Sequence, residues 1–103
     1  MPRSYSESFL LDLQRADPTR IGVQLGRLCV EANLPAAYVA AALETSRMSV
    51  YKWFRGGGVR EDKRKAIEVF MDLVNQDMQK GLLPAPNLFD AKRYIEEMVG
   101  ISL

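Results

Sequence analysis

The sequence predicts an all-α fold, a compact helical domain of five to six helices with a C-terminal helical extension. Apolar residues recur at intervals of three and four along most of the chain, which places them on one side of a helix. Residues that favour helix ends, among them Asn33, Ser46 and Gly81, flank these segments. The 103 residues can bury one hydrophobic core without metal or disulfide support.

Two helices are expected before residue 34. The first covers residues 6–16 and has an apolar face made of Phe9, Leu10 and Leu13. Asp17 followed by Pro18 is typical of an N-cap and a first helical residue, so the second helix is expected to begin there. It runs to about Ala32, and Asn33 ends it. Its buried face consists of Ile21, Leu25, Leu28, Cys29 and Ala32.

The next segment predicts two short helices joined by a tight turn. The first covers roughly Pro35 to Leu43, with Pro35 in its first turn and with Val39, Ala40 and Leu43 on its inner face. The small side chain of Ala40 allows a second helix to approach closely. Glu44 and Thr45 form the turn, and so short a turn forces a steep crossing, the geometry of a helix-turn-helix.

The second of these helices, Ser46 to Arg55, has two contrasting faces. Ser46 is placed to act as its N-cap, and Gly56 follows its last residue, where glycine adopts a left-handed conformation at low cost. One side is apolar and predicted to be buried: Val50, Trp53 and Phe54. The opposite side is cationic and able to donate hydrogen bonds: Arg47, Met48, Tyr51, Lys52 and Arg55.

This stretch resembles the lambda-repressor-like (Cro-like) helix-turn-helix proteins. The residues that stand in the register of that family are Val39, Ala40, Leu43, Ser46, Arg47, Val50, Trp53, Arg55 and Gly56. The resemblance covers the motif and, more loosely, residues 18–80. Glu44 stands where the family usually has glycine, which implies either a left-handed residue or an altered turn. Ala36 stands where a polar residue often contacts phosphate.

The resemblance implies a sequence-specific double-stranded DNA-binding transcriptional regulator, a repressor of phage or mobile-element type. Its recognition helix, 46–55, would lie in the major groove. The resemblance implies that Arg47, Met48 and Lys52 occupy base-reading positions. There the cations can donate to guanine, and the thioether can pack on a thymine methyl group. The positions that contact phosphate or bases are Ser46, Ser49, Tyr51, Arg55, Arg60, Lys63 and Arg64.

The charge of the chain is polarised although its net value is only +1. Residues 46–65 contain seven basic and two acidic residues, a net charge of +5, and the remaining residues carry −4. A local cationic surface of this kind is what displaces the counterions of DNA phosphates. A solvated charged helix start would give a similar cluster. Its coincidence with the helix-turn-helix favours nucleic-acid binding.

The C-terminal half is expected to contain two more helices, over residues 60–80 and 90–99. We expect residues 1–81 to form the DNA-binding part, and 82–103 an extension within the same domain. The extension carries Leu82, Leu83, Leu88, Phe89, Tyr94, Ile95, Met98 and Ile101. We predict that part of this set forms a homodimer interface; packing back on the core is the nearly equal alternative. Dimers are expected because one helix reads few base pairs.

Composition argues against several other classes of protein. The chain has no histidine and one cysteine, so Cys/His metal sites and intramolecular disulfides are excluded. No cofactor is expected, and no nucleophile lies beside a base, so we expect a protein that is not an enzyme. No apolar run is long enough to cross a membrane. We expect a cytoplasmic, nucleoid-associated protein.

A second hypothesis keeps the fold but changes the partner. The chain would then be an interaction module that binds a protein such as RNA polymerase or a toxin partner. Glu44, Ala36 and the nearly neutral total charge favour this alternative.

Overall fold

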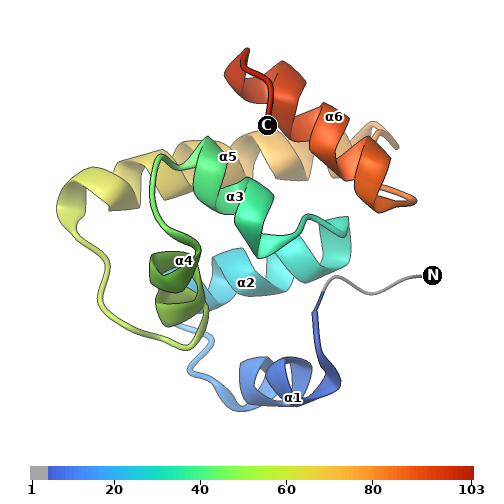
Figure 1. Ribbon diagram of the computed structural model, residues 1–103. Coiled ribbons are helices and arrows are strands. Elements are labelled where there is room, and N and C mark those ends of the chain that lie inside the picture. Colours follow the sequence, from blue (N-terminus) through green and yellow to red (C-terminus); the bar gives the residue numbers. More distant parts are fainter. Residues whose placement is uncertain (1–4) are drawn as a thin grey trace.

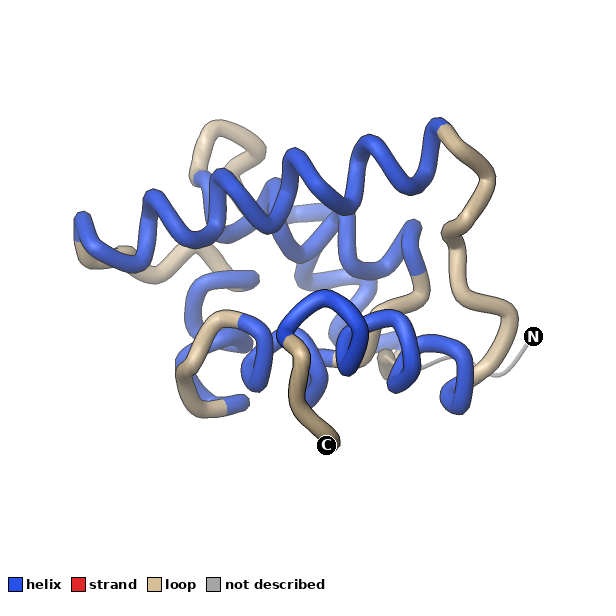
Figure 2. The backbone as a smooth tube through the Cα atoms, turned by 90° about the horizontal axis from the view of Figure 1, so that it is seen from above, coloured by secondary structure: helices blue, strands red, loops and turns tan. Residues whose placement is uncertain are grey.

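A computed structural model describes residues 5–103, so the first four residues of the expected 1–81 unit lie outside it. Six helices and no strand are present in this part of the chain (Figures 1 and 2), which confirms the all-α prediction. In Figure 1, α1 lies at the bottom of the domain and α6 at the top, with α2, α3 and α4 between them. The helices are α1 Glu7–Arg15, α2 Ile21–Ala32, α3 Ala36–Ala42, α4 Arg47–Phe54, α5 Glu61–Gln79 and α6 Leu88–Val99.

Most helix ends lie where the sequence predicts them. Asn33 adopts a left-handed conformation (φ 57°) at the end of α2, and Gly56 and Gly81 do so after α4 and α5 (φ 94° and 79°). α6 begins at Leu88, two residues earlier than expected. The reason is its cap, because the Asn87 side chain accepts a hydrogen bond of 2.8 Å from the backbone N–H of Asp90.

The predicted start of α2 is wrong. Asp17 does not cap the helix, because its carboxylate accepts hydrogen bonds from the N–H of Thr19 (2.9 Å) and from the Thr19 hydroxyl (2.7 Å). These bonds close a local turn, lower the pKa of Asp17, and delay the helix until Ile21. Pro35 is likewise displaced by one position, since it is the N-cap of α3 with an extended backbone (ψ 146°) rather than its first helical residue.

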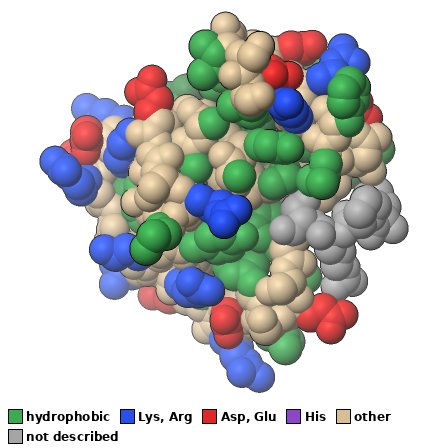
Figure 3. Space-filling view, in the orientation of Figure 1, with side chains coloured by type: hydrophobic (Ala, Val, Ile, Leu, Met, Phe, Trp, Pro, Cys, Tyr) green, Lys and Arg blue, Asp and Glu red, His purple; other side chains and the backbone are tan. Residues whose placement is uncertain are grey.

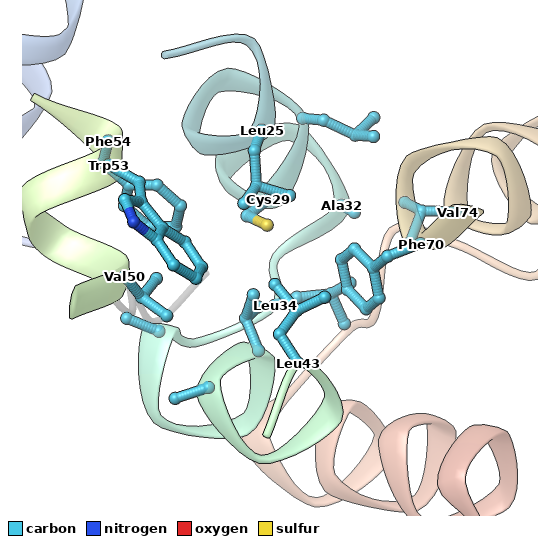
Figure 4. Packing of buried hydrophobic residues seen from close by; sticks show 14 of the residues in the cluster. Leu25, Cys29, Ala32, Leu34, Leu43, Val50, Trp53, Phe54, Phe70 and Val74 are labelled. Atoms are coloured by element: carbon cyan, nitrogen blue, oxygen red, sulfur yellow. The ribbon is translucent and has the colours of Figure 1, made fainter. Parts of the chain in front are cut away.

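The core forms where α2, α4 and α5 meet α3 (Figure 4). α4 contributes Trp53 and Phe54, α2 contributes Leu25 and Cys29, and α5 contributes Phe70 and Val74, all of them buried. The expected buried faces of α2 and α4 are therefore confirmed. Cys29 has no exposed surface, and its burial raises the pKa of the thiol, as expected for a small core residue rather than a reactive one.

Two glycines set how closely α2 and α4 pack. A Cβ atom added at Gly22 would lie 2.2 Å from the carbonyl oxygen of Trp53, well inside van der Waals contact. One added at Gly26 would lie 3.0 Å from both Leu13 Cδ1 and Phe54 Cγ. The absence of side chains at these two positions lets the backbone of α4 rest directly on α2. α4 is thereby held with its opposite face toward solvent.

The C-terminal extension packs on the core along much of its length. Leu83, Ala85, Ala91 and Ile95 are buried, and the N–H of Ala85 donates to the carbonyl of Ala32 at 3.0 Å. Figure 2 shows residues 80–87 leading from the end of α5 to α6, which runs back across the domain. Other apolar residues of the extension remain exposed: Leu82, Leu88, Phe89 and Ile101.

Candidate nucleic-acid interface

α4 presents one buried face and one solvent-exposed face. Val50, Trp53 and Phe54 are buried, whereas the Met48 side chain on the other side is 84% exposed. Arg47, Lys52 and Arg55 are also exposed. Ser46 caps the helix by accepting from the N–H of Ser49 at 3.1 Å, and its hydroxyl donates to the Ser49 hydroxyl at 3.0 Å. The two-faced helix expected from the sequence is therefore present.

The turn before α4 contains a left-handed glutamate. Glu44 has φ 53°, so of the two alternatives at this position the left-handed residue is the one observed. The conformation costs a residue with a Cβ atom about 1 kcal/mol, yet it lets the N–H of Thr45 bond to the carbonyl of Ala40 at 3.0 Å. Ala36, the other departure from the family pattern, is buried and offers no polar group to a ligand.

Lys63 lies against this turn. Its ammonium group donates to the carbonyl of Leu43 at 2.8 Å and to the carbonyl of Glu44 at 3.1 Å. These carbonyls follow the last residues of α3, where oxygens lack helical partners. The sequence suggested Lys63 as a contact to the DNA backbone. The structure places it as a link between α5 and the turn, which holds the orientation of α4.

Replacing Lys63 with methionine should lower the free energy of unfolding by about 1–2 kcal/mol, because two charge-assisted hydrogen bonds are lost. Urea denaturation followed by circular dichroism measures the change. Lys65→Met is the matched control, since Lys65 is exposed on the same helix and should change stability by less than about 0.5 kcal/mol. Equal effects of the two substitutions would contradict the assigned role of Lys63.

A groove lies between α1 and the exposed face of α4. It has a volume of about 750 Å³ and is lined by Ser6, Phe9, Arg47, Met48, Tyr51, Lys52, Arg55 and Gly57. Sequence reasoning did not foresee that α1 reaches this face. The ring of Phe9 packs edge-on against Tyr51, with 5.3 Å between centroids and an interplanar angle of 86°. Tyr51 is therefore half-buried rather than freely exposed.

The cations of the region fall into two groups. Arg60 lies 3.9 Å from Asp62, and Arg64 lies 3.8 Å from Glu68, in exposed pairs of little energetic value. By contrast, no ion pair joins Arg47, Lys52 or Arg55 to a carboxylate within residues 5–103. Figure 3 shows Lys and Arg side chains along the left side, where α5 begins, and others near the middle of the view with hydrophobic atoms between them.

Neither a metal-binding cluster nor a membrane-spanning helix is found in the part of the chain that the structure describes. Residues 5–103 contain no group of three or more histidine, cysteine, aspartate or glutamate residues that could hold a metal ion. None of the described helices is long and apolar enough to cross a membrane. A second groove, of about 300 Å³, is lined by Arg64, Glu68, Asp72 and uncharged residues of α2, α5 and the turn before α2, so it combines one positive charge with two negative charges.

Comparison with known proteins adds no assignment. No family model, no curated protein and no solved structure matches this chain.

Proposed function

We propose that this protein is a sequence-specific double-stranded DNA-binding transcriptional regulator, a repressor of phage or mobile-element type in the lambda-repressor-like family. α3 and α4 act as its helix-turn-helix, and α4 lies in the major groove. The observation that carries the proposal is the exposed face of α4, where Arg47, Lys52 and Arg55 have no carboxylate partner within residues 5–103. The protein acts by binding, not by catalysis, in the cytoplasm on the nucleoid.

The residues of this face have separate roles. Arg47 and Lys52 donate to guanine O6 and N7, and the exposed Met48 packs on a thymine methyl group. Ser46, Ser49, Tyr51 and the basic side chains around them contact the backbone, which fixes the register: Arg55, Arg60 and Arg64. Lys63 supports this surface through the turn it holds.

A salt titration tests the DNA-binding proposal. The purified protein should retain random-sequence duplex DNA at low salt, with log affinity falling linearly as log salt concentration rises. Lys52→Ala should reduce that slope by about one unit, because one cation of the DNA-facing surface is lost. Lys80→Ala, at the far end of α5, serves as the charge-matched control and should leave the slope unchanged. Failure of the wild-type protein to retain any duplex would refute the proposal.

Two copies of the chain would bind one operator through the exposed part of the extension. The apolar side chains of Leu82, Leu88, Phe89 and Ile101 supply the surface, and Phe89 is 68% exposed. A two-fold dimer would place two α4 helices in successive turns of the major groove.

We expect Phe89→Ser to weaken dimerisation about tenfold or more, because an aromatic anchor is lost from the centre of the interface. Sedimentation equilibrium measures the dissociation constant. Val69→Ser is the control, since Val69 is similarly exposed (61%) but lies on α5, outside the extension. A wild-type protein that sediments as a monomer at all concentrations would exclude this interface.

The alternative partner is a protein, such as a component of the transcription machinery or a toxin. The observation that favours it is the same exposed apolar surface of the extension, which a protein partner would cover as well as a second copy would. In that case the wild-type protein would retain no duplex DNA, and Phe89→Ser would abolish binding of the protein partner.

A further inference from the structure

The groove between α1 and α4 differs in charge from the smaller groove beside α5. Its lining contains three cationic side chains and no carboxylate, together with the rings of Phe9 and Tyr51. The smaller groove beside α5 combines one arginine with two carboxylates. Of these two grooves, the one between α1 and α4 therefore presents a cationic surface with an apolar floor. A polyanion that is narrow enough to enter it is the fitting ligand.

Arg55 is held in this groove by aromatic rings. Its guanidinium carbon lies 5.9 Å from the ring centroid of Phe9 and 5.9 Å from that of Tyr51. A guanidinium whose flat face lies over aromatic rings can still donate hydrogen bonds to a ligand through the N–H groups at its edge. Because the rings restrict the side chain before any ligand arrives, less conformational entropy is lost on binding.

The rings are themselves fixed. Phe9 is buried, and it packs on Phe54 at a centroid distance of 5.9 Å and on Tyr5 at 5.3 Å. The Tyr5 hydroxyl donates to the carbonyl of Leu34, and burial raises the pKa of this phenol, so it stays a donor. α1 is thereby tied to both α4 and the loop before α3. The position of Arg55 thus depends on α1 as well as on α4.

We infer that the part of the groove formed by Phe9, Tyr51 and Arg55 lies against the phosphodiester backbone of one DNA strand, and that Phe9 is a positioning residue which presents Arg55 to a phosphate. Arg47, Met48 and Lys52, which also line the groove, keep their proposed contacts to bases. This inference rests on the proposed function, and it assigns to α1 a part in the DNA-binding surface. The contact is to phosphate, so it raises affinity for every duplex and carries no sequence preference. The N–H edge of Arg55 supplies the charge-assisted hydrogen bonds.

A double-mutant cycle on a labelled random-sequence duplex tests the inference. Phe9→Leu keeps the core apolar but removes the ring, and it should weaken binding about threefold through loss of the cation–π contact and of the fixed Arg55. Phe9→Tyr keeps the ring and should bind like the wild type. In an Arg55→Ala background, Phe9→Leu should have no further effect. Phe9→Leu and Arg47→Ala should combine additively, because within residues 5–103 no cation–π contact joins Arg47 to the ring of Phe9.

The outcomes separate the inference from the proposed function. A wild-type protein that binds no duplex refutes both. Suppose that the wild-type protein binds duplex DNA and that Phe9→Leu weakens binding equally in the presence and in the absence of Arg55. The proposed function then stands, and the role of Phe9 is overturned. The same holds if Phe9→Leu has no effect.

A measurement on the unmodified protein remains decisive if Phe9→Leu does not fold. The Nε–H resonance of Arg55 in an NMR spectrum should shift on addition of the random-sequence duplex. The Nε–H resonance of Arg27, whose guanidinium donates to the carbonyls of Leu13 and Gln14, is the control and should not shift. An unchanged Arg55 resonance under conditions in which the duplex binds would overturn the inference.

Discussion

Gly22→Ala should destabilise the domain by at least about 3 kcal/mol, a large part of the stability typical of a domain of this size. The added Cβ would lie 2.2 Å from the carbonyl oxygen of Trp53 and 2.8 Å from its Cβ, and backbone atoms cannot move aside as a flexible side chain does. Alanine favours the helix by about 1 kcal/mol over glycine, which is too little to offset the clash. Thermal and urea denaturation measure the loss.

Gly58→Ala is the matched control for this substitution. A Cβ at Gly58 would meet no atom within 4 Å, so stability should be unchanged or should rise by about 0.5 kcal/mol. Because Gly22 fixes α4 on α2, the Gly22→Ala protein should also lose DNA retention whereas Gly58→Ala should keep it. A Gly22→Ala protein as stable as the wild type would show that α2 and α4 do not pack as described.

Arg47→Ala should lower affinity for a selected DNA site about tenfold to a hundredfold, the value of one good contact between arginine and a base. Arg47 is exposed and is the first residue of α4, so its replacement should change the free energy of unfolding by less than about 0.5 kcal/mol. Fluorescence anisotropy with the selected duplex, and with the same duplex altered at each base pair, measures affinity and specificity.

The control for Arg47 is Arg60, a cation that we propose contacts the DNA backbone. Arg60→Ala should weaken binding to all duplexes by a similar factor and leave the ranking of sequences unchanged, because phosphates carry no sequence information. Arg47→Ala should instead relax the preference at one base pair in each half-site. If both variants weaken all duplexes equally, Arg47 does not read a base.

The helices and their buried faces could be predicted because local signals decide them. Val50, Trp53 and Phe54 fall on one side of the helix wherever its two ends are drawn, and all three are buried. Caps such as Ser46 and Asn33 act within a few residues of their own position. The prediction at Asp17 was wrong because the local signal is ambiguous: an aspartate before proline can cap a helix or close a turn. In this protein the hydrogen bonds from Thr19 to the Asp17 carboxylate form a turn.

The parts that could not be predicted depend on contacts between residues distant in sequence. Gly22 and Gly26, four residues apart on α2, carried a signal for close helix packing, but only the position of Trp53 shows what approaches them. In the sequence, nothing distinguishes Lys63 from the basic residues around it. In the structure, its ammonium group donates to the carbonyl of Leu43, twenty residues earlier in the chain. The packing of α1 on Tyr51 had no sequence signal, since Phe9 only indicated that α1 has an apolar face.

Selection of bound fragments from a pool of random-sequence duplexes tests the central claim most directly. If α4 reads the major groove in a dimer, the enriched fragments should share a pseudo-palindrome whose half-sites lie about one helical turn apart, or a multiple of it. The same selection with Arg47→Ala should lose the preference at one symmetric pair of positions. Recovery of fragments without any shared sequence, from a wild-type protein that is folded, would contradict the claim.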